Sequence, residues 1–158
     1  MRAYADTSFL IKLLAREESS EAAAAAYRRL GLPRLFLVDL HGLEVENAVR
    51  QRAFHQRRTV PRAEQARVTR ELAAILARYA RARQKGMLIE VAVDWQESFR
   101  QALRLSAKHT TATGSRSLDL LHIACALELE AEVFLTTDLC QSRMATAEGF
   151  QVVTVEDP

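Results

Sequence analysis

Short apolar runs alternate along the chain with longer stretches in which apolar residues recur at helical spacing. Each run is rich in Val, Ile, Leu, Phe or Tyr, which is typical of strands buried on both faces of a parallel sheet. Their alternation with helices predicts an α/β domain. We therefore expect a three-layer fold with a mostly parallel, five-stranded sheet flanked by helices. The predicted strands cover residues 2–5, 35–38, 88–93, 133–136 and 152–155.

The stretches that follow the first two predicted strands favour helices. An apolar helix is expected over 9–14, Ser20 precedes an Ala-rich helix, and a helix over 40–56 ends in a basic cluster. A longer helix begins near Pro61, and the helical spacing of its apolar residues leaves the arginines mainly on its other faces. The predicted buried stripe of this longer helix is Val68, Leu72, Ile75, Leu76 and Tyr79.

Two more helices are predicted in the second half of the chain. Asp94 and Glu97 form an acidic version of the capping box and open the first of them. Its predicted buried stripe is Trp95, Phe99, Ala102 and Leu103. The polar residues 108–116 are predicted to form a loop, and Ser117 is expected to cap the second helix. The buried stripe expected there is Leu120, Ile123, Ala124 and Leu127.

Composition narrows the class of protein. The chain has 158 residues, 49% of them hydrophobic, so one domain spanning 1–158 can bury a core. Cys125 and Cys140 are too few for a disulfide framework, and Cys125 is expected to be a buried, reduced thiol. Asp6 and Lys12 interrupt the N-terminal apolar segment, and no apolar stretch is long enough to span a bilayer. We expect a cytoplasmic protein with no membrane partner.

The net charge is small, but its distribution along the chain is uneven. Residues 50–85 contain eleven Lys or Arg against two Glu, a net +9, so the rest of the chain carries −7 to give the total of +2. This basic helical arm suits a polyanionic partner such as nucleic acid or an acidic peptide. A solvated, arginine-rich helix would have the same composition, and the charge alone does not separate the two interpretations.

Two acidic residues directly follow predicted strands. Asp6 comes after the first strand, and Asp138 comes after the strand at 133–136. In parallel sheets, ligands bind beyond the carboxyl ends of the strands, so both carboxylates are candidates for one site. An Asp at a strand end is also a common helix N-cap, and that alternative stays open for each residue taken singly.

Two further acidic residues are predicted to lie on helices. Glu44 has apolar neighbours, and Asn47 lies three residues later on the same helical face. Asp119 falls in the first turn of a helix, where the macrodipole favours a carboxylate. Because its flanking residues are leucines, we expect its side chain to enter a pocket rather than open solvent.

A cluster of four carboxylates would need a cation, because burying uncompensated negative charges together is costly. Oxygen ligands favour Mg²⁺ or Mn²⁺ over zinc. No two histidines have a zinc-ligating spacing and no cysteine joins them, so a zinc site is not favoured. His122 is expected to be a core group or a hydrogen-bonding group beside the site.

Four motifs together carry a resemblance to a known family. They are YADTS at 4–8, Glu44 followed by Asn-Ala at 47–48, SLDLLHIA at 117–124 and LTTD at 135–138. In this order they resemble a PIN domain, and more specifically the VapC ribonuclease toxins of bacterial and archaeal toxin–antitoxin pairs. The resemblance covers nearly the whole chain. It implies a PIN-like fold and a Mg²⁺-dependent endoribonuclease that hydrolyses RNA phosphodiester bonds with metal-activated water, with Mn²⁺ as the alternative ion.

The resemblance also implies the site residues. The catalytic acidic quartet would be Asp6, Glu44, Asp119 and Asp138. Asp6 and Asp119 would bind the metal directly, while the other two would hold its waters or a second ion, or Glu44 would act as a base. The supporting polar residues would be Thr7, Ser8, Asn47 and Thr136. Many relatives place a further acid or Asn shortly after the final Asp, and residues 139–141 offer none.

Partners are implied in the same way. RNA would be the substrate, with possible contacts from His109 and Arg116, which frame the polar loop before Asp119. A small VapB-like antitoxin would occlude the acidic site. The groove that receives the antitoxin would lie along the paired helices after the second strand. A homodimer is also implied. The alternative function is a non-catalytic PIN-like module that binds RNA or a peptide through its basic arm.

Overall fold

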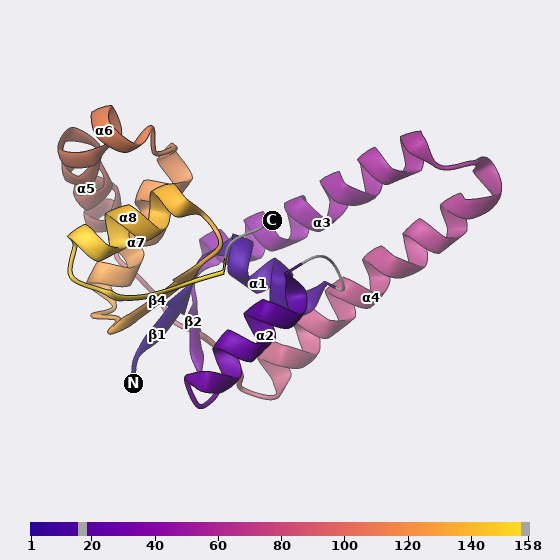
Figure 1. The fold of residues 1–158 in the computed structure, drawn as a ribbon, viewed down its shortest axis with the longest axis horizontal. Coiled ribbons are helices and arrows are strands. Elements are labelled where there is room, and N and C mark those ends of the chain that lie inside the picture. The colour runs from indigo at the N-terminus through magenta and orange to yellow at the C-terminus, as the bar shows by residue number, and fades with distance from the viewer. Residues whose placement is uncertain (16–18, 156–158) are drawn as a thin grey trace.

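A computed structural model describes residues 1–15 and 19–155 of the chain (Figure 1). Five parallel strands form one sheet in the order β3-β2-β1-β4-β5. The predicted α/β fold with a five-stranded sheet is therefore confirmed, and every strand pair in it is parallel. The strands are β1 (Ala3–Ala5), β2 (Leu35–Leu37), β3 (Leu88–Glu90), β4 (Val133–Thr136) and β5 (Gln151–Thr154).

Helices cover both faces of the sheet, and each face has its own hydrophobic core. The strand residues alternate between the two cores: Ala5 and Leu135 face one, whereas Tyr4 and Phe134 face the other. On the first face lie α1 (Thr7–Leu14), α2 (Ser20–Arg29), α3 (Asp39–Thr59) and α4 (Gln65–Gln84). On the second lie α5 (Trp95–Leu105), α7 (Ser117–Glu128) and α8 (Leu139–Ala147). This is the predicted three-layer arrangement.

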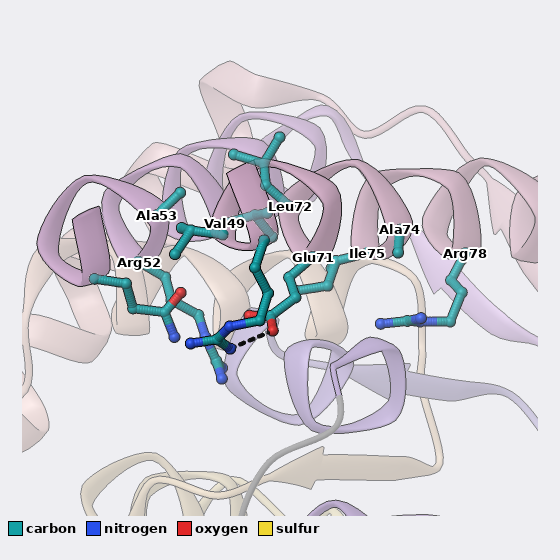
Figure 2. A pocket seen from close by; sticks show the side chains of 11 residues that line it. Val49, Arg52, Ala53, Glu71, Leu72, Ala74, Ile75 and Arg78 are labelled. Atoms are coloured by element: carbon teal, nitrogen blue, oxygen red, sulfur yellow. Dashed lines mark hydrogen bonds and ion pairs between the residues drawn. The ribbon is translucent and has the colours of Figure 1, made fainter. Parts of the chain in front are cut away.

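Helices α3 and α4 pair side by side and project from the body as a hairpin (Figure 1). The 3-10 turn Arg62–Glu64 leads into α4. The predicted stripe of α4 is confirmed, with Val68, Ile75 and Tyr79 buried. Between the two helices lies a hollow of about 540 Å³ (Figure 2). It is lined by apolar side chains that include Val49 and Leu72 and by charged ones that include Arg67, Glu71 and Arg78.

The buried face of α5 differs from the prediction. Its predicted stripe residues Phe99 and Leu103 are 56% and 71% exposed, and the buried residues are Ser98, Ala102 and Leu105. The cause is close packing against α7: the small side chain of Ser98 donates a 2.6 Å hydrogen bond to Glu128 near the end of that helix. At the position of Ser98, a bulky side chain would hold the two helices apart.

The predicted loop at 108–116 is mostly helical, so that prediction was wrong. A π-helical turn (Ser106–Thr110) continues α5 and is followed by the short α6 (Thr111–Thr113), which ends at Gly114 with φ +69°. A tertiary contact overrides the weak local preference, since the side chain of His109 is buried and lies 2.5 Å from Glu148 of the α8 C-terminus.

Ser117 does not cap α7 with its side chain. It is the first residue of the helix, and the carboxylate of Asp119 accepts a 2.9 Å hydrogen bond from the backbone N–H of Arg116 instead. The α7 stripe is confirmed in Leu120, Ile123 and Ala124, and every residue from 120 to 126 is buried, including Cys125. Burial raises the pKa of the Cys125 thiol to about 11, as expected for a protonated core cysteine. Within residues 1–15 and 19–155, every helix is too short or too polar to cross a bilayer.

Candidate active site

The candidate site lies where β1 and β4 end. These two strands pair directly, with Ala5 opposite Leu135. The chain places β2 on one side of β1 and β4 on the other, so the strand order reverses at this point of the sheet. In open parallel sheets such a reversal leaves a crevice at the carboxyl ends of the strands, where ligands bind. Asp6 follows β1 directly, and Asp138 follows β4 after one intervening residue.

Asp6 is completely buried, and its carboxylate is held by several donors. Its Oδ1 accepts a 2.9 Å hydrogen bond from the backbone N–H of Phe9, so Asp6 caps α1. The hydroxyl of Ser8 donates to Oδ1 at 2.7 Å, and that of Thr136 donates to Oδ2 at 2.7 Å. Burial nevertheless raises the pKa of Asp6, because the donors only partly replace the lost hydration.

The side chains that hold Asp6 are themselves fixed to β4 and the residues after it. The hydroxyl of Ser8 accepts from the backbone N–H of Thr137 at 3.0 Å. The hydroxyl of Thr136 accepts from the backbone N–H of Asp138 at 2.9 Å. One hydrogen-bonded network therefore links the ends of β1 and β4, and it leaves the Asp6 carboxylate little freedom to turn.

Asp119 comes from the first turn of α7 and is half-buried. Burial raises the pKa of its carboxyl group, and the negative charge of Asp138 raises it further. Asp138 caps α8 by accepting a 2.9 Å hydrogen bond from the backbone N–H of Gln141. Asp138 is thus close enough to oppose the ionisation of Asp119.

The amide side chain of Gln141 connects two of the acids. Its Nε2 donates to Oδ2 of Asp6 at 2.8 Å and to Oδ1 of Asp119 at 3.3 Å. Gln141 is itself buried. This contact brings the carboxylates that follow β1 and begin α7 to the same point, although 113 positions separate them in the chain.

Glu44 reaches the site from α3. Its Oε2 accepts a 2.8 Å hydrogen bond from the hydroxyl of Thr7 and lies 2.5 Å from Nε2 of His122. Burial acts to raise the pKa of Glu44, but the hydrogen bond and the charge of His122 outweigh it and lower the pKa overall. The fold therefore favours the ionised form of Glu44.

Two buried histidines support this side of the site. The hydroxyl of Tyr4 lies 2.9 Å from Nδ1 of His122. His41 accepts from the backbone N–H of Val38 through Nδ1 at 3.0 Å, and its Nε2 donates to the carbonyl of Ala5 at 2.8 Å. Burial lowers the pKa of His41 to about 3, so this ring is neutral and ties α3 to the end of β1.

Three residues expected near the site lie elsewhere or contribute differently. Asn47 is exposed and lines a separate shallow hollow with Glu46 and Arg50. His109 pairs with Glu148 at the C-terminal end of α8, the end opposite to Asp138. Arg116 contributes its backbone N–H to Asp119, and its charge lowers the pKa of that carboxyl group.

Sequence reasoning missed the part that Gln141 plays. Residues 139–141, directly after Asp138, contain no further acid or Asn, yet the Gln141 amide contacts both Asp6 and Asp119. A detectable signal was present: a polar residue three positions after a helix N-cap lies within the first turn, close to the capping carboxylate. The hydrogen bond from Tyr4 to His122 had no such signal, because 118 positions separate the two residues.

Comparison with known protein families identifies the family of the chain. Residues 3–147 match the PIN domain. The chain belongs to the PIN domain family. PIN domains are generally nucleases that use divalent metal ions, which supports a hydrolase of phosphodiester bonds. No curated protein matches this PIN domain chain.

The donor set of this PIN domain fits a hard divalent cation. Its carboxylate and amide groups offer oxygen ligands, and the raised pKa values of Asp6 and Asp119 reflect a negative charge that the fold does not fully compensate. Within the described ranges, no three His, Cys, Asp or Glu side chains already stand in a ligating arrangement. The nitrogen of Gln141 stands between the two carboxylates instead.

Proposed function

We propose that this protein is a Mg²⁺-dependent endoribonuclease, with Mn²⁺ able to replace Mg²⁺. The observation that carries the proposal is the convergence of Asp6 and Asp119 on one amide group at the switch point of a PIN domain sheet. Both carboxylates have raised pKa values, and a bound cation would offset the charge that burial opposes. Two carboxylates that serve only to bond the backbone at the start of their own helices would not need to converge.

Asp6 and Asp119 would hold the metal ion, with Asp138 beside Asp119. A divalent ion at such a site lowers the pKa of the attacking water and neutralises charge that develops on the phosphoryl oxygens. Asp6 cannot swing away, because Ser8 and Thr136 fix it. The site can therefore orient a phosphodiester with little rearrangement of its own groups.

Glu44 is proposed to orient the attacking water or to accept its proton. Its lowered pKa keeps it ionised at neutral pH, and its hydrogen bonds to Thr7 and His122 fix the direction of the carboxylate. A group that orients or deprotonates water needs a free lone pair and a defined position. The structure leaves Oε1 of Glu44 available in addition to the bonded Oε2.

RNA is proposed to lie across the acidic site and to contact cationic side chains nearby. Arg116 is exposed beside Asp119 and is a candidate for a phosphate contact. The α3–α4 hairpin carries the excess of basic residues between 50 and 85. Cations there would attract the RNA backbone and make its association depend on salt.

The first test is cleavage of a panel of structured RNAs, including tRNA, by the purified protein. We expect cleavage with Mg²⁺ or Mn²⁺ and none with excess chelator. The alternative, a non-catalytic binding module, predicts RNA binding that does not depend on metal and no cleavage of any RNA in the panel. Binding is measured by filter retention in the same buffers, so that the two outcomes are separated directly.

A finer proposal concerns biological role. By its resemblance to VapC proteins, the chain would be the toxin of a toxin–antitoxin pair and would form a homodimer. The hollow between α3 and α4 supports a groove for an antitoxin segment, because it combines apolar side chains such as Val49 and Leu72 with the charged Arg78 (Figure 2). A VapB-like partner would extend from this groove over the acidic site.

Growth of cells that express the chain tests this role. Expression of the unchanged protein should arrest growth, and Asp6→Asn should remove the arrest. Co-expression of a short reading frame found directly upstream should relieve it, whereas Leu72→Glu should prevent relief by placing a charge in the hollow. Growth unaffected by the unchanged, folded protein would contradict the toxin role. Light scattering coupled to size-exclusion chromatography checks the homodimer.

A further inference from the structure

Gln141 has an unusual position among the acids of the candidate site. The residue is 4% exposed, and its Nε2 donates to Asp6 at 2.8 Å and to Asp119 at 3.3 Å. The other end of the same amide, Oε1, is buried and has no hydrogen-bond partner in the described part of the chain. No other buried side-chain N or O atom there lacks a partner.

An unpartnered buried acceptor is costly, because it has given up its hydration without a replacement. Placing a polar amide here therefore needs a compensating reason. The Nε2 end of the amide has such a reason. This neutral group donates to two carboxylates that would otherwise face each other with no positive charge between them. The Oε1 end makes no hydrogen bond in the described part of the chain that would offset its burial.

The two ends of an amide differ in chemistry but hardly in shape. Rotation about the last side-chain bond exchanges Nε2, a donor, for Oε1, an acceptor that suits a hard cation or its waters. The backbone does not need to move, because the N–H of Gln141 is held by Asp138 at 2.9 Å. The Gln141 amide can therefore interact with the site through Nε2 when no cation is bound and through Oε1 when one is.

We propose that Gln141 is a positioning residue for the divalent ion. Without metal, its Nε2 holds the carboxylates of Asp6 and Asp119 together. When the ion is bound, the amide is turned so that Oε1 faces the ion or its waters. This inference rests on the proposed function for the nature of the ion, and it adds a group outside the acidic quartet to the site.

Metal affinity of two matched variants tests the proposal. Gln141→Met keeps the length of the side chain but has neither the donor nor the oxygen, whereas Gln141→Glu keeps an oxygen and adds charge. Isothermal titration of Mn²⁺ into the full chain should show affinity weakened about tenfold or more by Gln141→Met and strengthened about tenfold by Gln141→Glu. Circular dichroism checks that each variant is folded before titration.

A packing role predicts a different result. If Gln141 only fills space in the first turn of α8, then Gln141→Met binds Mn²⁺ within about twofold of the unchanged protein, and the proposal is overturned. Failure of the unchanged protein to bind Mn²⁺ would overturn the proposed function together with this inference. Binding by the unchanged protein with an unaltered Gln141→Met affinity would overturn this inference alone.

Nuclear magnetic resonance provides a readout independent of affinity. The side-chain NH₂ signals of Gln141 are identified by their loss in Gln141→Met. Saturating Mg²⁺, a diamagnetic ion, should shift these signals, because Nε2 leaves the two carboxylates. Unchanged NH₂ signals in a Mg²⁺-saturated sample would contradict the rotation of the amide.

Discussion

Nε2 of His122 lies 2.5 Å from Oε2 of Glu44, a short contact between a helix of one layer and a helix of the other. The opposite ring nitrogen, Nδ1, lies 2.9 Å from the hydroxyl of Tyr4. Because an ionised carboxylate only accepts, Nε2 carries a hydrogen and donates to Glu44, and in that tautomer Nδ1 accepts from the Tyr4 hydroxyl. A buried phenol on β1 therefore supports the ring that directs a candidate active-site carboxylate.

Tyr4→Phe should destabilise the protein and loosen the hold of His122 on Glu44. The change removes one hydroxyl and leaves Nδ1 of the buried His122 without its donor, which costs about 1–3 kcal/mol. Urea unfolding measures the free energy. We also expect slower cleavage at saturating Mg²⁺ with little change in RNA affinity, since Glu44 is misdirected but remains present. Wild-type stability with wild-type cleavage would refute this hydrogen-bond chain.

Asp119→Asn should stabilise the metal-free protein while removing activity. Burial and the charge of Asp138 raise the pKa of Asp119, so folding disfavours its ionised form relative to the unfolded chain. A neutral amide relieves that cost. In chelator, the melting temperature should rise by a few degrees, where 2–4 °C corresponds to about 1 kcal/mol for a chain of this size. Cleavage should fall at least about 100-fold. A lower melting temperature in chelator would count against charge repulsion at this site.

The neutral state of His41 predicts how stability depends on pH. Its pKa is lowered from 6.5 to about 3 in the fold, so below pH 6.5 the unfolded chain binds a proton that the folded protein does not. Stability from this residue is therefore complete above pH 6.5 and is lost as the pH falls toward 3. Between pH 7 and pH 5 the loss is about 2 kcal/mol.

His41→Gln provides the comparison for that loss. The variant has no ionisable group at this position, so its free energy of unfolding should fall less between pH 7 and pH 5 than that of the unchanged protein. The difference between the two falls, measured by urea unfolding, should be about 2 kcal/mol. Equal falls would mean that His41 is protonated in the fold.

Glu148 provides a test of whether His109 is structural. Burial opposes its ionisation, but Lys108 and His109 together lower the pKa of Glu148. A carboxyl pKa lowered by folding stabilises the protein above its ordinary value of 4.5, and this contribution is lost as the pH falls through the lowered value. Glu148→Gln should cost about 1–2 kcal/mol at neutral pH, and this cost should shrink as the pH falls through the lowered pKa of Glu148. Its RNA cleavage should be unchanged, and a large loss of cleavage in the folded variant would place His109 at the substrate.

The sequence predicted the sheet well because strands buried on both faces are short, continuous apolar runs that need no partner to be recognised. It also placed Asp6 and Asp138 beyond strands that turned out to be neighbours. Side-chain spacing was less informative for α5, whose buried face is set by the closeness of α7 through Ser98 and not by the largest apolar residues.

Long-range polar contacts were the main information that the sequence did not contain. Nothing local to Tyr4 or Gln141 indicates the partners that the fold gives them. Spacing on a helix placed Asn47 on the same face as Glu44, but over three residues the face turns far enough for Asn47 to be exposed. The acids could be chosen from sequence, whereas the groups that hold and orient them required the structure.

The most direct test of the account is the rate of cleavage of one labelled RNA as Mg²⁺ is titrated, for the unchanged protein, Asp6→Asn and Asp39→Asn. Asp39 is an exposed carboxylate in the first turn of α3 and serves as the matched control. We predict that the unchanged protein and Asp39→Asn respond to Mg²⁺ alike, and that Asp6→Asn cleaves at least about 100-fold more slowly at every concentration. Cleavage by folded Asp6→Asn at the rate of the unchanged protein would contradict the account.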